Sequence, residues 1–244
     1  MTDEFLRMPN WYLPLAPYTM PTVFVRLRPE AVAALAAGAD GGEKVSLKSD
    51  VSRQVIRDLS EPMKHIPGSC FPVVDVCAPT DTERFEVKGG AVHSARSAWF
   101  YLTQSEKVAK AAAAGQVSYI GLRPFRKVNR TREFRLFIFK RQLVAMSQYH
   151  LTRHFRRLEG FRKKYWQAAQ EFVSRLAWRL EVESLVMDIY ITSKNEILIF
   201  DLNPWGEPTD PLLLKSWERD WSVVSGLELM APPLAIKGDV KVSF

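Results

Sequence analysis

The chain has 244 residues and a formal net charge of +7; 47% of its residues are hydrophobic and 25% are charged. These proportions are typical of a folded globular protein and exclude the disordered and fibrous classes. No apolar run approaches the roughly 20 residues that span a bilayer, and the chain starts with acids where a secretory signal needs bases. We therefore expect a cytoplasmic protein. Its positive charge favours an anionic partner, which is a nucleotide, a nucleic acid or an acidic protein surface.

The first half of the chain is predicted to alternate between strands and helices. The first twenty residues contain Trp11 and Tyr18 among three prolines and are expected to form an irregular segment held to the body by aromatic side chains. Hydrophobic periodicity and turn residues then predict, in order, a strand at 22–27, a helix at 28–37, a loop at 38–50, a helix at 52–63, strands at 71–76, 85–90 and 97–102, and a helix at 104–114. Cys70 and Cys77 are too few for a metal cage or a disulfide scaffold, so we expect both in the core.

The second half of the chain is predicted to contain two hairpins and one long helix. Its elements are strands at 118–122 and 133–139, a hairpin partner at 143–147, an amphipathic helix at 161–180, strands at 185–191 and 196–203, and a short helix within an irregular ending after residue 210. Helices mixed with antiparallel hairpins indicate an α/β (α+β) fold. We divide it into an N-terminal subdomain at 1–117 and a C-terminal subdomain at 118–244.

Three polar side chains in the last hairpin form the strongest functional signal. Side chains alternate along a strand, so Asp201 and Asn203 project from one face while Leu198, Phe200 and Leu202 project from the other. If residues 194 and 195 form a two-residue turn, Asp188 falls directly opposite Asp201 on the same face. Two carboxylates and an amide close together on one face of a hairpin predict a magnesium site, because this ion prefers oxygen ligands.

A structural alternative exists for the same residues. Asp188 would end a strand, and Asn203 followed by Pro204 would belong to a turn. A register shifted by one residue would also place Asp188 on the opposite face and remove the site. Against this alternative, Asp201 follows four apolar residues, and a strand interior rarely holds an unpaired charge.

Further motifs extend this signal along the chain. They are Glu133-Phe134-Arg135, Ser147-Gln148, Asp188-Ile-Tyr-Ile191, Asp201-Leu-Asn-Pro-Trp-Gly206 and Thr209-Asp-Pro-Leu-Leu213, with weaker matches at Trp11-Tyr12, Phe71-Pro72, Ala78-Pro79-x-Asp81 and Leu122-Arg123. Through these motifs most of the chain resembles the cell division cycle protein 123 family, an offshoot of the ATP-grasp superfamily. The resemblance implies an ATP-grasp-like fold of two closely packed subdomains, with a small lobe in the first and the magnesium and nucleotide site in the second.

The resemblance also implies ligands and a partner. Asp188, Asp201 and Asn203 match the family's magnesium ligands, and Arg123 and Arg135 match basic residues near the nucleotide, so the implied cofactors are ATP and Mg²⁺. Members of the family are ATP-binding assembly chaperones that grip the gamma subunit of eukaryotic translation initiation factor 2. The chain would thus be a nucleotide-dependent protein-binding module rather than an enzyme, with this partner only if its host has the factor. For Arg135 a surface strand charge is the alternative.

The chain departs from the family where phosphates are expected. Val73 and Thr103 stand in place of two phosphate-binding lysines, which implies weakened or lost ATP binding. Lys88, followed by two glycines, would supply a replacement charge, although a glycine turn between strands is the alternative. The Ser147-Gln148 pair is followed by Tyr149-His150 instead of Arg-Asp.

Two further functions compete with a nucleotide-binding chaperone. An ATP-grasp ligase would activate a carboxylate as an acyl phosphate and pass it to an amine, but no acceptor motif is visible. The basic and aromatic segment 153–164 would contact RNA, or an acidic protein, or only solvent. We rank nucleic acid last as a partner and expect no membrane. His150 and His154 are four residues apart but lack the further ligands of a zinc site.

Overall fold

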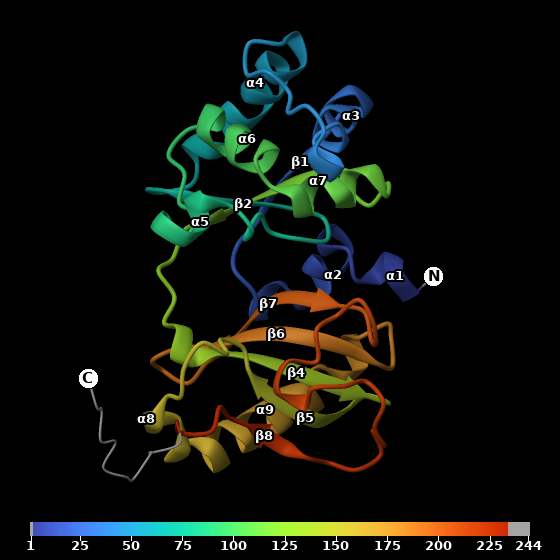
Figure 1. Ribbon diagram of the computed structural model, residues 1–244, viewed down its shortest axis with the longest axis vertical. Helices are drawn as coiled ribbons and strands as arrows, with labels where there is room; N and C mark the ends of the chain where they lie inside the picture. The colour runs from blue at the N-terminus through green and yellow to red at the C-terminus, as the bar shows by residue number, and fades with distance from the viewer. Residues whose placement is uncertain (1, 234–244) are drawn as a thin grey trace, which may run out of the picture.

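The computed structural model describes residues 2–233, whose strands form two sheets that lie one above the other (Figure 1). The small-sheet lobe contains the three-stranded sheet and the helices packed on it, and the large-sheet lobe contains the five-stranded sheet. The chain passes between the lobes at residues 19–22 and 125–132. Helices and mostly antiparallel strands confirm the predicted mixed α/β class.

The small-sheet lobe is an antiparallel sheet covered by helices on the side away from the other lobe (Figure 1). Its strands run in the order β1-β3-β2, namely Val23–Arg26, Tyr119–Pro124 and Cys70–Val74. Its helices are α3 (Pro29–Ala36), η2 (Ala39–Gly41), α4 (Asp50–Lys64), α5 (Glu83–Lys88), α6 (Ala95–Thr103) and α7 (Glu106–Ala113). Leu59, Trp99 and Leu102 are completely buried between helices and sheet. Cys70 and Cys77 are free thiols in this core, as predicted.

The large-sheet lobe contains five strands in the order β7-β6-β4-β5-β8. They are β4 (Glu133–Phe139), β5 (Gln142–Gln148), β6 (Leu185–Ile191), β7 (Ile197–Asn203) and the short β8 (Gly226–Glu228), which pairs parallel with β5. The other elements are α8 (Arg156–Glu159), α9 (Arg162–Leu176) and the 3₁₀ turns η3 (Arg130–Arg132), η4 (Ala177–Arg179) and η5 (Leu212–Leu214). Tyr165 and Phe172 of α9 pack into one core with Phe134 and Leu136 of β4. Because side chains alternate, Arg135 lies on the opposite face from α9.

The first residues are short helices rather than an irregular segment. They form α1 (Thr2–Phe5), α2 (Met8–Leu15) and η1 (Ala16–Tyr18), which lie between the two sheets in Figure 1. The predicted attachment by aromatic residues is correct, because Trp11 is completely buried in the core of the large-sheet lobe.

Two predicted strands are helices. The segment 85–90 falls in α5 and its end, where the Thr82 hydroxyl accepts a hydrogen bond from the backbone N–H of Phe85 and Gly89 ends the helix in a left-handed conformation at φ 62°. The segment 97–102 lies in α6, which begins with a capping box between Ser94 and Ser97. Its buried residues Ala95, Ala98, Trp99 and Leu102 have helical spacing, which the run of aromatic residues obscured.

The two sheets do not divide the chain at the predicted boundary. β3 lies after residue 117, yet it is the central strand of the small sheet. Residues 2–18 precede the small-sheet lobe in sequence but pack in the core of the large-sheet lobe. The change from one sheet to the other therefore follows Pro124, and the N-terminal helices belong with the C-terminal sheet. Within residues 2–233, no helix has both the length and the hydropathy required to cross a membrane.

Candidate functional site

A cavity of about 320 Å³ lies between the two lobes. The small-sheet lobe contributes side chains from β2, β3 and α7 and from the end of α5, and the large-sheet lobe contributes side chains from β4, β6 and β7. The lining is mostly apolar, with a group of charged residues at the large sheet. A concave, largely apolar space with a few convergent polar groups is the usual form of a small-molecule site.

Asp188 and Asp201 lie directly opposite each other on β6 and β7, as predicted. The predicted two-residue turn is wrong. The loop contains three residues, Ser193 to Asn195, and Asn195 adopts a left-handed conformation with φ 64°. This loop would pair Asp188 with Phe200, but a β-bulge between Asp188 and Ile189 shifts the register by one residue and restores the pair.

The bulge also changes which side chains share a face. Ile199 and Leu202 both point into the core, whereas the intervening Phe200 and Asp201 both line the cavity. Phe200 was predicted to project away from Asp201, and that prediction is wrong because the extra residue interrupts strict alternation. Asn203 lines the same cavity. All three predicted metal ligands therefore come together.

Asp188 is held by an ion pair with Arg135 of the neighbouring strand. The guanidinium Nε and Nη2 donate to the two carboxylate oxygens at 2.7 and 2.8 Å, and Nη1 donates to the backbone oxygen of Asp210 at 2.7 Å. Asn203 Nδ2 also donates to Asp188 Oδ2 at 3.0 Å. Burial alone would lower the pKa of Arg135, but the Asp188 carboxylate raises it above its ordinary value. Arg135 is thus a buried partner of Asp188 rather than a surface charge.

Arg123 links the two lobes from inside the protein. Its side chain extends from β3, and Nη1 donates to the backbone oxygen of Phe200 on β7 at 3.0 Å, while Nε donates to Thr22 Oγ1 at 3.2 Å. The residue is 4% exposed. Burial lowers its pKa to about 10, although Asp201 opposes this change. Arg123 lines the cavity, but all three of its side-chain nitrogens already bond to the protein, since Nη2 donates to Met8 Sδ at 3.0 Å.

Asp201 is a carboxylate without adequate charge compensation. One oxygen accepts a hydrogen bond from the backbone N–H of Leu202 at 3.0 Å. Burial and, to a lesser extent, the nearby Asp188 raise the pKa of Asp201 to about 7, although Arg123 and Lys107 act in the opposite direction. A metal cation beside Asp201 would stabilise its ionised form.

The donor set fits a magnesium ion. Asp188, Asp201 and Asn203 are all oxygen donors, and within residues 2–233 no group of three or more His, Cys, Asp or Glu side chains gathers to form a complete protein cage. Mg²⁺ commonly takes one or two carboxylates from the protein and fills its remaining positions with water and phosphate oxygens. This site therefore suits a magnesium ion that arrives with an anionic ligand.

The positions expected to hold phosphates are dispersed. Val73 lines the cavity from β2 as an apolar side chain, and Thr103 is buried in α6, where its hydroxyl donates to the backbone oxygen of Phe100. Lys88 is exposed at the end of α5, and it is Gly89, the next residue, that lines the cavity. Gly89 ends a helix and does not join two strands.

The cavity also contains charged residues that the sequence analysis did not assign to it. Lys107 of α7 and Arg126 after β3 line it from the small-sheet side. Glu133 and His150 line it from the large-sheet side, with His150 Nε2 at 3.0 Å from Glu133 Oε2. The unusual Tyr149-His150 pair was the available signal for His150. Lys107 and Arg126 belong to no motif, and only the fold brings them to the cavity.

Comparisons with known proteins identify relatives of the chain. The D123 family model matches residues 91–220. A translation initiation factor eIF2 assembly protein from Xenopus laevis is 32% identical over 88 residues, which cover 36% of this chain and 26% of that protein. A protein of the same name from Sclerotinia sclerotiorum is 25% identical over 239 residues, covering 89% of this chain and 57% of that protein. The first of these matches thus spans about a quarter of the relative's length.

The fold is also that of a solved structure. C-terminally truncated Cdc123 from Schizosaccharomyces pombe superimposes with a TM-score of 0.77 at 19% sequence identity, covering 93% of this chain and 95% of that one. This likeness confirms the predicted fold.

Proposed function

The chain belongs to the D123 family, and from this premise we propose that it binds a magnesium–nucleotide complex in the cavity between its lobes and uses it in assembling a protein partner. The observation that carries the proposal is the opposition of Asp188 and Asp201 beside Asn203 inside that cavity. Two carboxylates at this point are unfavourable without a cation, and the cation in turn favours an anionic ligand.

Each predicted ligand has a distinct part in this proposal. Asp201, which has the weakest charge compensation, would be a principal magnesium ligand. Asp188 would share its oxygens between the ion and Arg135, whose planar fork fixes the orientation of the carboxylate. Asn203 would offer its side-chain oxygen while its nitrogen donates to Asp188. Bound magnesium would neutralise the charge of the phosphate oxygens.

The apolar part of the cavity supports a nucleotide as the anionic ligand. Phe71, Phe85, Phe125 and Met20 provide a surface on which a flat base would pack. Arg123 would support this site by keeping β3 and β7 together, because its bond to the Phe200 backbone crosses the boundary between the lobes. We propose ATP or ADP as the nucleotide and the cytoplasm as the compartment.

The names of the relatives support a protein partner. Several are translation initiation factor eIF2 assembly proteins, and we propose that this chain likewise assists the assembly of a multi-subunit protein. The initiation factor is the partner only in a host that has it. Co-purification of the tagged chain from its host, with and without Mg²⁺ and ATP, would test this part of the proposal.

One observation favours a ligase as the second candidate. Glu133 and His150 form a close pair in the same cavity, which is the arrangement of a group that accepts a proton from a nucleophile. A ligase would release ADP or phosphate in the presence of a suitable carboxylate and amine. A screen of such pairs that detects no release above the Asp201→Asn variant would favour the chaperone.

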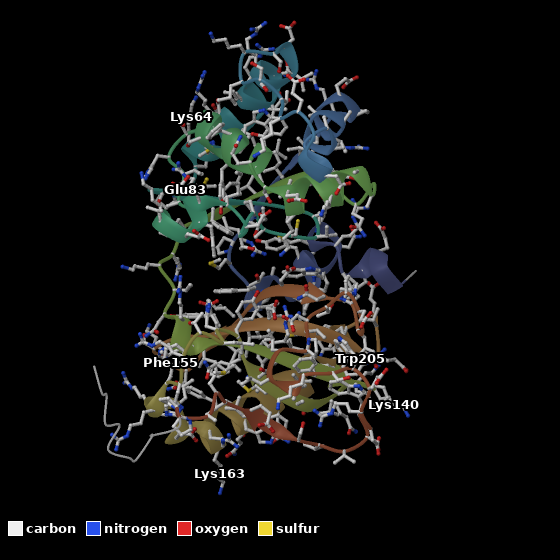
Figure 2. All side chains as sticks on the ribbon, in the orientation of Figure 1. Lys64, Glu83, Lys140, Phe155, Lys163 and Trp205 are labelled. Carbon is white, nitrogen blue, oxygen red and sulfur yellow. The ribbon has the colours of Figure 1, made fainter. Side chains whose placement is uncertain are left out.

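The basic segment 153–164 gives little support to RNA binding through the cavity. Lys163 lies at the end of the large-sheet lobe that is farther from the small-sheet lobe and points outward, whereas Phe155 lies at the side of that lobe (Figure 2). An RNA bound there would depend steeply on salt and would not require nucleotide.

Calorimetric titration with Mg²⁺ and ATP tests the main proposal. The parent chain should bind the nucleotide only with Mg²⁺ present, and Asp201→Asn should bind it much more weakly. Glu171→Gln on the exposed face of α9 is the control and should bind as the parent does. Equal binding by the parent and Asp201→Asn would contradict the assignment of the metal site.

A further inference from the structure

We propose that Lys107 of α7 holds the terminal phosphates of the bound nucleotide, replacing the cations expected at positions 73 and 103, and that it makes the site selective for nucleoside diphosphates and triphosphates. This inference rests on the proposed nucleotide site. It assigns a residue, and a ligand preference, that the family motifs do not contain.

The cations that line the cavity differ in how many of their donors are free. Arg135 is bonded to Asp188 and to the backbone of Asp210. Arg123 is bonded to Phe200 and Thr22. By contrast, within residues 2–233 the ammonium of Lys107 makes no hydrogen bond and no ion pair, and the same is true of the Arg126 guanidinium. Of these four residues, only Lys107 and Arg126 can bind a phosphate without breaking an existing hydrogen bond.

The backbone of Lys107 is fixed by hydrogen bonds, although its ammonium group has no partner in the part of the chain that the structure describes. Asp81 accepts a hydrogen bond from the Ser105 hydroxyl at 2.5 Å and another from the backbone N–H of Lys107 at 2.9 Å. These bonds fix the first turn of α7 against the rest of the small-sheet lobe. The exposed Lys107 side chain then has its full length with which to reach into the cavity.

Lys107 lies on the opposite wall from the proposed metal ligands. Lys107 on α7 and Asp201 on β7 line the same cavity from its two sides. A phosphate chain beside a metal at Asp201 and Asn203 would therefore come within reach of Lys107 from the small-sheet lobe. Arg126 lies after β3, beside the aromatic part of the cavity at Phe125.

The two positions that the family motifs point to cannot serve this purpose. Val73 has no charge, and the hydroxyl of Thr103 is already used within α6. Lys110, one helical turn after Lys107, pairs with Glu106 at 2.8 Å and with Asp40 at 3.5 Å, and it does not line the cavity. Lys110 is consequently a matched control for charge and helix position.

Calorimetry of four proteins with four ligands tests the proposal. The proteins are the parent, Lys107→Ala, Lys107→Arg and Lys110→Ala, and the ligands are adenosine, AMP, ADP and ATP, the last two with excess Mg²⁺. Losing one charged hydrogen bond should weaken ADP and ATP binding by roughly 10- to 100-fold in Lys107→Ala. Adenosine binding should change less than about threefold, Lys107→Arg should retain most of the affinity for ADP and ATP, and Lys110→Ala should match the parent.

The outcomes separate this inference from the function on which it rests. If the parent binds none of the four ligands, both the nucleotide site and the role of Lys107 are wrong. If the parent binds Mg–ADP and Lys107→Ala binds it equally well, only the role of Lys107 is wrong. An equal loss for adenosine and ADP in Lys107→Ala would also overturn the inference, because it would indicate a damaged site. Circular dichroism of each variant would show whether α7 is intact.

Discussion

Asp188 on β6 faces Asp201 on β7 because a three-residue loop and a β-bulge have opposite effects on the register of one hairpin. Without the bulge, Asp201 would pair with Met187 and point into the core. Bulges are often found near functional sites, where they redirect a side chain. Here the bulge places a carboxylate at the cavity and also exposes the Phe200 backbone oxygen to Arg123 of the other lobe.

The loop of this hairpin should tolerate glycine but not a β-branched residue. Asn195 has φ 64°, a conformation that asparagine and glycine adopt readily. We expect Asn195→Gly to be close to neutral and Asn195→Val to lower the free energy of unfolding by about 1–2 kcal/mol. Urea denaturation of both variants would measure this difference, and equal stability of the two would contradict the assigned loop conformation.

Replacing Asp201 with asparagine should stabilise the metal-free protein at high pH. The pKa of Asp201 is about 7 in the folded protein and 3.8 for an ordinary Asp, so between these values the unfolded chain releases a proton that the folded chain retains. Stability therefore falls as pH rises through this window. Asp201→Asn should remove this loss, with a gain on the order of 1–4 kcal/mol at pH 8 and none below pH 3.8.

Urea titrations at pH 3.5, 6 and 8 with EDTA would test the effect, with Glu171→Gln as the control. A gain that is the same at every pH would show that Asp201 ionises normally. With excess Mg²⁺ and ADP at pH 8, the parent should be more stable than Asp201→Asn, because only the parent then gains binding energy.

Breaking the buried ion pair of Asp188 should cost much more than breaking an exposed one. The side chains of Arg135 and Asp188 are 8% and 12% exposed. Arg135→Met leaves Asp188 without its charge partner, and we expect a loss of about 3–5 kcal/mol. The exposed pair of Lys64 and Glu61 is the comparison, since its side chains are 70% and 68% exposed, and Lys64 lies far out on the small-sheet lobe (Figure 2).

Lys64→Met should change the free energy of unfolding by at most about 1 kcal/mol. The double variant Arg135→Met with Asp188→Leu should recover part of the stability, because it leaves no unpaired buried charge. Similar losses for Arg135→Met and Lys64→Met in urea denaturation would mean that the buried pair has no special role.

Nucleotide should raise the thermal stability of the protein only together with magnesium. A ligand at 100 times its dissociation constant stabilises the folded state by about 2.7 kcal/mol, which raises the Tm of a chain of this size by several degrees. We expect this shift with Mg²⁺ and ADP, and we expect EDTA, Asp188→Asn or Asp201→Asn to abolish it. Differential scanning fluorimetry measures it directly, and an equal shift in the presence of EDTA would exclude a magnesium-dependent site.

Local patterns in the sequence were sufficient to predict several features. Alternation along residues 197–203 indicates a strand with a polar pair, and the spacing predicts that Asp188 lies opposite Asp201. That opposition is correct, but it depends on a three-residue loop and a β-bulge that the local pattern did not predict. The helical spacing of residues 161–180 predicted α9. In contrast, the aromatic run at 97–102 predicts a strand but lies in α6, because short apolar segments satisfy the strand and the helix pattern about equally well.

What the sequence by itself determined is the mixed α/β class, most of the elements, and the three residues Asp188, Asp201 and Asn203 that meet in one hairpin. Only the tertiary structure decided that Arg123 and Arg135 are bonded within the protein, that β3 belongs to the small sheet, and that Lys107 lines the cavity. The physical reason is how far apart along the sequence the interacting residues lie. A hairpin joins residues a few positions apart through local backbone geometry, whereas Lys107 and Asp201 line one cavity only after two separate cores have packed and brought distant segments together.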